Sequence, residues 1–105
     1  MGFEFTSVVA NAGRLRILAA LAREGREAEF VRLREVTGMT DGNLSAHARR
    51  LAEAGLISIE KRFREGKPVT WFRITQAGKY AIKACARELL ESVEEGDVGG
   101  EEWVD

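Results

Sequence analysis

Residues 39–55, with the sequence MTDGNLSAHARRLAEAG, limit the fold more than any other stretch, because they hold a complete set of helix signals. Thr40 or Asp41 can cap the start, since a short side-chain oxygen accepts hydrogen bonds from backbone N–H groups that have no helical partner. Gly55 can end the helix, because the residue after a helix often needs the positive φ that glycine adopts without strain. The stretch therefore predicts one short helix over about residues 41–54.

The two sides of this predicted helix differ in character. At about 100° per residue, Leu44, Ala48 and Leu51 fall on one side, which we expect to lie on the protein core. The other side has small residues at its centre and two arginines beside them; its members are Gly42, Ser45, Ala46, Arg49, Arg50 and Glu53. A helix that faces only solvent more usually carries Glu and Lys there. This face therefore suits close contact with an anionic partner, and we expect that partner to be DNA.

The net charge of −1 by itself argues against DNA, but the distribution of charge favours it. Residues 88–105 hold eight acidic side chains and neither Lys nor Arg. Residues 1–87 hold 16 basic and nine acidic side chains, which leaves a net charge of +7. Such asymmetry indicates a nucleic-acid partner and a charged tail. We expect one domain over residues 1–95, followed by a flexible acidic tail over residues 96–105.

Length and composition bound the class of protein. A chain of 105 residues has room for one domain. We expect no membrane span, because no run approaches the roughly 18 apolar residues that one needs. We also expect no signal peptide, because the first residues have no basic flank before an apolar core. Cys85 is the only cysteine and cannot form an internal disulfide, which favours a reducing, cytoplasmic location.

Two helices are predicted before residue 39. Residues 7–23 repeat apolar side chains at three- and four-residue steps, at Val8, Ala12, Leu15, Leu18 and Leu21 or Ala22. Residues 30–37 are predicted to form a short helix with Phe30, Leu33 and Val36 inward, and Gly38 ends this helix. Two short helices joined by three or four residues that include a glycine are the signature of a helix-turn-helix. The alternative, an ordinary helical hairpin, would normally have longer helices.

After Gly55 the apolar period changes from 3.6 to 2, which predicts a β-hairpin. Ile57, Ile59 and Phe63 alternate with polar residues, residues 64–68 form a turn cluster, and alternation resumes over residues 69–74. The basic side chains at or near the turn are Lys61, Arg62, Arg64 and Lys67. An isolated hairpin is barely stable, so we expect its apolar face to pack on the helices.

A last helix is predicted over residues 76–93, with Thr75 as its cap. Its alanine-rich apolar surface is wider than a domain of this size needs for its own core. We interpret the excess as a subunit interface, assisted by apolar residues at the N-terminus. The expected interface residues are Phe3, Phe5, Val9, Ala81, Cys85, Leu89 and Val93.

Helices, a two-stranded wing and a last helix, in this order, make a winged helix-turn-helix, a mainly α fold with a small β-hairpin (α+β). The segment MTDGNLSAHARRLAEAGLISIEKRFREGKPVTWFRITQAGK resembles the recognition helix and wing of small MarR- and ArsR-like transcriptional regulators. The resemblance is carried by the runs LSAH at residues 44–47, LAEAGLI at residues 51–57 and FRIT at residues 72–75, followed by Ala77-Gly78. At position 48 the family often has a larger apolar residue. The smaller Ala48 of this chain thins the packing under the helix.

The resemblance implies a dimeric regulator that binds double-stranded DNA at a palindromic operator. The recognition helix, residues 41–54, would enter the major groove, and the wing, residues 61–68, would meet the flanking backbone. The expected DNA contacts are Thr40, Gly42, Asn43, Ser45, Ala46, His47, Arg49, Arg50, Lys61, Arg62, Arg64 and Lys67. For Arg49 and Arg50 the alternative is two solvated helix charges, and for His47 it is packing of the turn. The rival function is a winged-helix module that binds a protein and reads no DNA sequence.

Other chemistry has little support in the residues. One histidine, His47, and one distant cysteine, Cys85, offer no zinc-ligand spacing, and the cysteine cluster of metal-sensing ArsR-like proteins is absent. We expect no metal, no cofactor and no enzymatic activity, because no nucleophile–base pair or phosphate loop is evident. Cys85 is expected to be a small buried side chain, with redox sensing as the alternative. Any small-molecule effector, of unknown identity, would bind at the dimer cleft.

Overall fold

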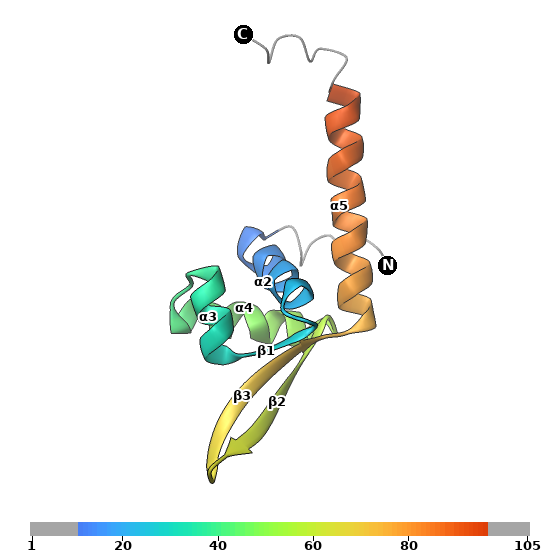
Figure 1. Cartoon of the computed structure of the whole chain (residues 1–105). Helices are drawn as coiled ribbons and strands as arrows, with labels where there is room; N and C mark the ends of the chain where they lie inside the picture. The colour runs from blue at the N-terminus through green and yellow to red at the C-terminus, as the bar shows by residue number, and fades with distance from the viewer. Residues whose placement is uncertain (1–10, 97–105) are drawn as a thin grey trace.

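The computed structural model describes residues 11–96, and their side chains as far as residue 93. Within this part of the chain, four helices and three strands follow one another. They are α2 (Ala12–Arg23), β1 (Glu27–Glu29), α3 (Phe30–Thr37), α4 (Asp41–Glu53), β2 (Ile57–Arg64), β3 (Lys67–Ile74) and α5 (Gln76–Gly96). The expected α+β winged helix is confirmed. Figure 1 shows α2, α3 and α4 gathered in one body, from which the β2–β3 hairpin and α5 extend.

Helix α2 begins at Ala12, within the helix predicted over residues 7–23. Its cap is Asn11, whose side-chain oxygen accepts a hydrogen bond from the backbone N–H of Arg14 at 3.1 Å. The predicted start at residue 7, with Val8, lies outside the described residues. The buried face is formed by Ile17, Leu18 and Leu21. Leu15, expected inward, is only half-buried, so the inward face is rotated slightly from the predicted one.

The turn between α3 and α4 is held by threonine hydroxyls. Thr37 is buried, and its hydroxyl donates to the carbonyl of Leu33 at 2.7 Å and accepts from the N–H of Met39 at 3.3 Å. Because Thr37 takes the inner position, Val36 is exposed, and its predicted inward placement is wrong. Thr40 caps α4 as predicted, by accepting from the N–H of Asn43 at 3.2 Å.

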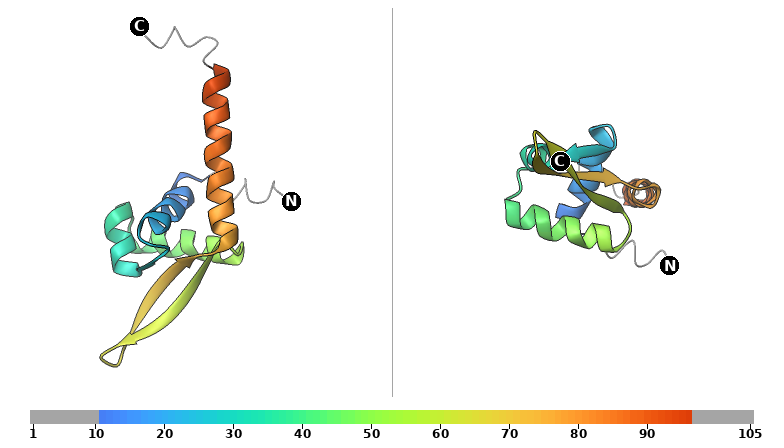
Figure 2. Two further views of the ribbon diagram at one scale, coloured as in Figure 1. Left: turned by 45° about the vertical axis from the view of Figure 1, so that its right-hand side comes forward. Right: turned by 90° about the horizontal axis from the view of Figure 1, so that it is seen from below.

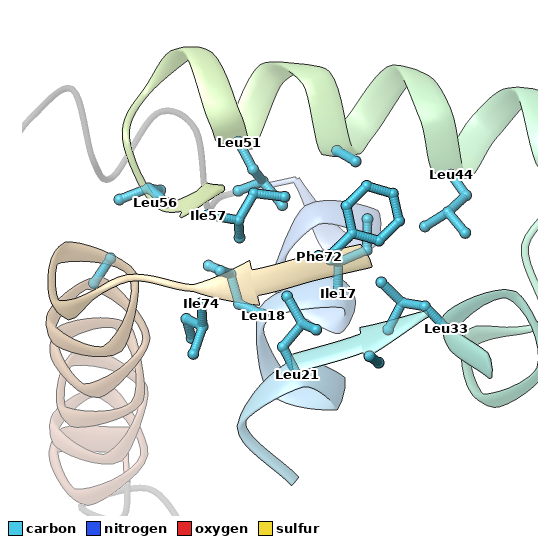
Figure 3. Packing of buried hydrophobic residues seen from close by; sticks show 13 residues of the cluster. Ile17, Leu18, Leu21, Leu33, Leu44, Leu51, Leu56, Ile57, Phe72 and Ile74 are labelled. Atoms are coloured by element: carbon cyan, nitrogen blue, oxygen red, sulfur yellow. The ribbon is translucent and has the colours of Figure 1, made fainter. Parts of the chain in front are cut away.

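The core lies between α4, the sheet and α2. Leu44, Ala48 and Leu51 are all buried, as their spacing predicted. Figure 3 shows Leu44 and Leu51 pointing from α4 toward the strands, into the same cluster as Ile17, Leu18 and Leu21 of α2. The fully buried larger side chains are Ile17, Leu18, Leu21, Leu33, Leu44, Leu51 and Leu56. The side chain at residue 48 is small and yet only 1% exposed, so the helix lies close to the core there.

The sheet has a third strand that the sequence did not predict. The strand order is β1-β3-β2, and both pairings are antiparallel. Ala28 of β1 is buried opposite Phe72, and the backbone N–H of Ile74 donates to the carbonyl of Arg26 at 2.8 Å. Three residues are too few for alternation to be recognised, so the two-stranded wing expected here was incomplete.

The hairpin packs on the body only at its base. Its turn is shorter than predicted. Strand β2 ends at Arg64 and β3 begins at Lys67, so only Glu65-Gly66 lie between them. Ile57, Phe72 and Ile74 are buried, whereas Ile59 and Phe63 are exposed, Phe63 by 73%. The expected packing of the apolar face on the helices is therefore confined to the base of the hairpin. Figure 2 shows that the hairpin extends past the helical body, in the direction opposite to α5.

Only the first part of α5 belongs to the core. Its cap Thr75 accepts from the N–H of Gly78 at 3.0 Å and donates to the carbonyl of Gly55 at 2.7 Å. Ala81 is buried, but the larger apolar side chains further along α5 are exposed, namely Leu89, Leu90 and Val93. Among the helices that the structure describes, none has the length and apolar character to cross a membrane.

Candidate nucleic-acid interface

The outer face of α4 presents the residues that the sequence placed there. Because Leu44, Ala48 and Leu51 anchor the helix to the core, the side chains between them point outward. The exposed residues on this side are Gly42, Asn43, Ser45, Ala46, Arg49 and Arg50. Neither Arg49 nor Arg50 forms an ion pair with another residue of the described chain. Both guanidinium groups are therefore available to an external anion.

The start of α4 is held in place from α3. Arg34 donates to the carboxylate of Asp41 at 2.7 Å, which links the last turn of α3 to the first turn of α4. This hydrogen bond raises the pKa of Arg34 further. The ion pair also offsets the negative charge of Asp41 at a helix end where backbone N–H groups favour an anion. The hydroxyl of Thr40 is occupied by capping, so its role here is to position the helix.

His47 points away from the expected DNA face. It is half-buried, and a Cβ placed on Gly13 of α2 would lie 2.8 Å from its Nε2 atom. His47 therefore packs α4 against the start of α2, and we remove it from the expected DNA contacts.

The wing has two chemically different faces, because side chains alternate along a strand. Ser58, Glu60, Arg62 and Arg64 lie on one face of β2, and Ile59, Lys61 and Phe63 lie on the other. We call the face with Arg62, Arg64 and, from β3, Arg73 the arginine face. Each of its arginines meets a glutamate, and two of these glutamates come from β1.

Arg62 is enclosed by partners. Its guanidinium donates to Glu27 at 2.8 Å and to Glu60 at 3.0 Å, and it lies 4.3 Å from the centre of the Trp71 ring. Arg73 adds a further hydrogen bond to Glu27 at 3.2 Å. The hydrogen bond from Arg62 lowers the pKa of Glu27 and raises that of Arg62. Arg62 therefore links the wing to β1, and we also remove it from the expected DNA contacts.

The other cations expected at the wing are Lys61, Arg64 and Lys67. Arg64 pairs with Glu29, and their hydrogen bond lowers the pKa of Glu29. Lys61 donates to the hydroxyl of Thr70 at 2.8 Å, and Lys67 has no ion pair within the described residues. The roles of Glu27 and Glu29 were not predicted. Their two-residue spacing in a short strand-like run was the signal that could have indicated a shared face.

A hollow elsewhere on the described surface offers little chemistry. A shallow groove of about 370 Å³ lies between α2 and α3. Its arginines are largely engaged, since Arg32 pairs with Glu24 at 3.0 Å and Arg16 donates to the carbonyl of Thr37 at 3.1 Å. In the part of the chain that the structure describes, no three His, Cys, Asp or Glu side chains come together as a metal site would require.

The expected dimer residues separate into three groups. Phe3, Phe5 and Val9 lie outside the described residues. Ala81 is 2% exposed within its own subunit's core and Cys85 is partly buried against that core, so Ala81 has no surface to offer a partner and is withdrawn from the interface. Leu89 and Val93 are exposed beyond the body.

A winged helix-turn-helix with an exposed, partly basic helix defines a class of DNA-binding proteins, and comparison with known proteins agrees. The chain belongs to the winged helix DNA-binding domain family, whose sequence profile matches residues 14–93. It is 39% identical over 88 residues to the uncharacterized protein MJ0432 of Methanocaldococcus jannaschii, a match that covers 83% of this chain and 89% of that protein.

Solved structures lead to the same class. A transcriptional regulator homologue from Pyrococcus horikoshii OT3 superposes with a TM-score of 0.81 at 29% identity, over 88% of this chain and 90% of that one. The antimony-specific transcriptional repressor AntR gives a TM-score of 0.65 at 28% identity, over 89% and 79% of the two chains. The resemblance to winged-helix transcriptional regulators is thus confirmed.

Proposed function

We propose that this protein is a cytoplasmic, dimeric transcriptional regulator that binds double-stranded DNA at specific sequences. The observation that carries the proposal is the outer face of α4, where small exposed residues lie beside Arg49 and Arg50, which form no ion pair within the described residues. The family supports DNA binding as the general activity.

Sequence reading is assigned to α4 in the major groove. The groove is wide enough for one α-helix, and the small side chains of Gly42 and Ala46 let the backbone approach the base edges. Arg49 can donate two hydrogen bonds to the N7 and O6 atoms of a guanine, or to a phosphate. Asn43 and Ser45 lie near the N-terminal end that enters the groove in such motifs.

Dimerisation is assigned to the exposed part of α5. Ile82, Ala86, Leu89 and Val93 follow one another at steps of four, three and four residues, so they form a single stripe along the helix. Ile82 is partly buried against the core, and the other three are exposed. A second copy of the same helix would cover this stripe. A two-fold dimer implies a palindromic operator with half-sites about one helical turn, or a multiple of it, apart.

The proposal includes a site for a small-molecule effector. One structural neighbour, NadR, was solved in complex with 4-hydroxyphenylacetate, although at 20% identity it supports the fold alone. We place any effector of this protein in the cleft between the paired α5 helices and the body.

Selection of bound duplexes from a random DNA pool tests the function. A recovered palindromic motif, bound with an affinity that falls steeply as salt rises, is the expected result, because phosphate contacts release counterions. A flat salt response without sequence preference would instead support the rival function, a protein-binding winged helix.

A further inference from the structure

The short strand β1 places two carboxylates against the arginine face of the wing. Glu27 and Glu29 lie on the same side of β1, because Ala28 between them points into the core. Glu27 contacts Arg62 and Arg73, and Glu29 contacts Arg64. Figure 1 shows β1 beside the base of the hairpin. The carboxylates thus bind all three guanidinium groups of the arginine face, and for Arg64 and Arg73 they are the only ion-pair partners among the described residues.

Both carboxylates are ionised at neutral pH. Hydrogen bonds from Arg62 and Arg64 lower the pKa values of Glu27 and Glu29, respectively. A carboxylate and a phosphate accept the same two-pronged hydrogen bonds from a guanidinium group. With Glu60, the three arginines of this face meet three glutamates, so the face is close to neutral.

Arg62 and Arg64 of the arginine face differ in how easily they can exchange a carboxylate for another anion. At the base, Arg62 has two carboxylates and the Trp71 ring, so its release would break several contacts. Toward the tip, Arg64 is 58% exposed and has Glu29 as its only ion-pair partner among the described residues. An exposed single ion pair contributes little free energy, so an incoming phosphate can replace the carboxylate.

We propose that Glu29 competes with DNA phosphate for Arg64 and so lowers the affinity of the wing for any DNA backbone. The inference rests on the proposed DNA-binding function. When phosphate takes Arg64, Glu29 remains nearby as an unpaired negative charge, well within the roughly 10 Å over which charges interact at 0.1 M salt. Backbone contacts carry no sequence information, so Glu29 reduces affinity for specific and random sequences by the same factor.

The test compares two isosteric substitutions in the full chain, Glu29→Gln and Glu24→Gln. Glu24 is a matched control: its carboxylate is 25% exposed and pairs with an arginine, Arg32, that is 54% exposed, whereas Glu29 is 24% exposed. Both changes remove one negative charge, but the Glu24–Arg32 pair joins the end of α2 to α3, away from the wing. Binding to a random-sequence duplex and to the selected operator is measured over a series of salt concentrations.

Glu29→Gln is expected to bind both duplexes about two- to five-fold more tightly at low salt, the range of an exposed ion pair. Its plot of log affinity against log salt should steepen by up to about 0.9, because one more phosphate is contacted. Glu24→Gln should match the wild type. In an Arg64→Ala background, Glu29→Gln should have little effect on DNA affinity, because no Arg64 guanidinium group is left for Glu29 to withhold from phosphate.

Two results distinguish failure of the Glu29 competition from failure of the proposed DNA-binding function. If the wild type binds DNA and Glu29→Gln binds it no better than Glu24→Gln, the competition by Glu29 is refuted while the proposed function stands. If no duplex is bound by the wild type or any variant, the proposed function and this inference fall together. Thermal melting checks each fold, and Glu29→Thr, which suits a strand, replaces the glutamine variant if that variant unfolds.

Discussion

Gly78 lies directly beneath the backbone carbonyl of Leu56, so close that a Cβ on Gly78 would come within 2.1 Å of the carbonyl oxygen. The same carbonyl accepts a hydrogen bond from the N–H of Thr75 at 3.0 Å. The start of α5 is thus fixed on the residue that joins α4 to the wing. The glycine is required here for close approach of two backbones, since no side chain fits between them.

Gly78→Ala should therefore destabilise the fold by about 2–3 kcal/mol, because the collision is with backbone and the helix must shift. The measurement is chemical denaturation followed by circular dichroism. Gly42→Ala is the control, since Gly42 also lies in a helix but has open space around it. That control should be neutral or up to about 1 kcal/mol more stable through helix propensity. Equal stability of the two variants would contradict the packing described for Gly78.

Arg49→Ala tests whether α4 reads sequence. If Arg49 pairs with a base, the change should cost about 1–3 kcal/mol at the operator and relax the preference at one position of the site. Lys67→Ala in the wing is the contrasting variant, because a backbone contact should weaken binding to all sequences evenly and flatten the salt dependence. Binding curves for the operator and for single-base variants distinguish the two patterns. An Arg49→Ala protein with unchanged affinity and preference would show that this face of α4 does not meet the bases.

Leu89→Glu tests the dimer stripe. A charged side chain in the stripe should yield monomers in sedimentation at micromolar concentration and sharply weaker operator binding, because a buried unpaired carboxylate is costly. Tyr80→Glu is the control: Tyr80 is an exposed, large side chain of the same helix, two residues and about 200° away from Ile82. Ala81→Glu is unsuitable, since Ala81 is buried in its own subunit and the change would unfold it. A wild-type monomer would contradict the interface outright.

Deleting residues 96–105 tests the acidic tail, most of which lies outside the described residues. The deletion removes Asp97, Glu101, Glu102 and Asp105. Carboxylates tethered near a basic body compete with phosphate, so the truncated protein should bind random DNA more tightly at low salt. The difference should fade as salt screens it. If full-length and truncated proteins bind random DNA equally at low salt, the tail serves solubility only.

The sequence by itself determined the elements whose signals are local. Thr40 and Gly55 bound α4, the spacing of Leu44, Ala48 and Leu51 oriented it, and Thr75 started α5, because caps and periodicity depend on neighbours only a few residues away. The outward position of Arg49 followed from the same period. These features sufficed to predict the winged helix and most of the exposed face of α4.

Only the tertiary structure decided how distant residues neutralise or bury one another. Glu27 meets Arg62 across 35 residues of chain, and this removes an apparent DNA contact. His47 turns toward Gly13 of another helix, and Ala81 is taken up by the core although its helix face looked like an interface. Pairing across a sheet and packing between helices depend on three-dimensional neighbours, which a pattern of one-dimensional periods does not specify. The charge of a wing is therefore set as much by the strand beside it as by its own arginines.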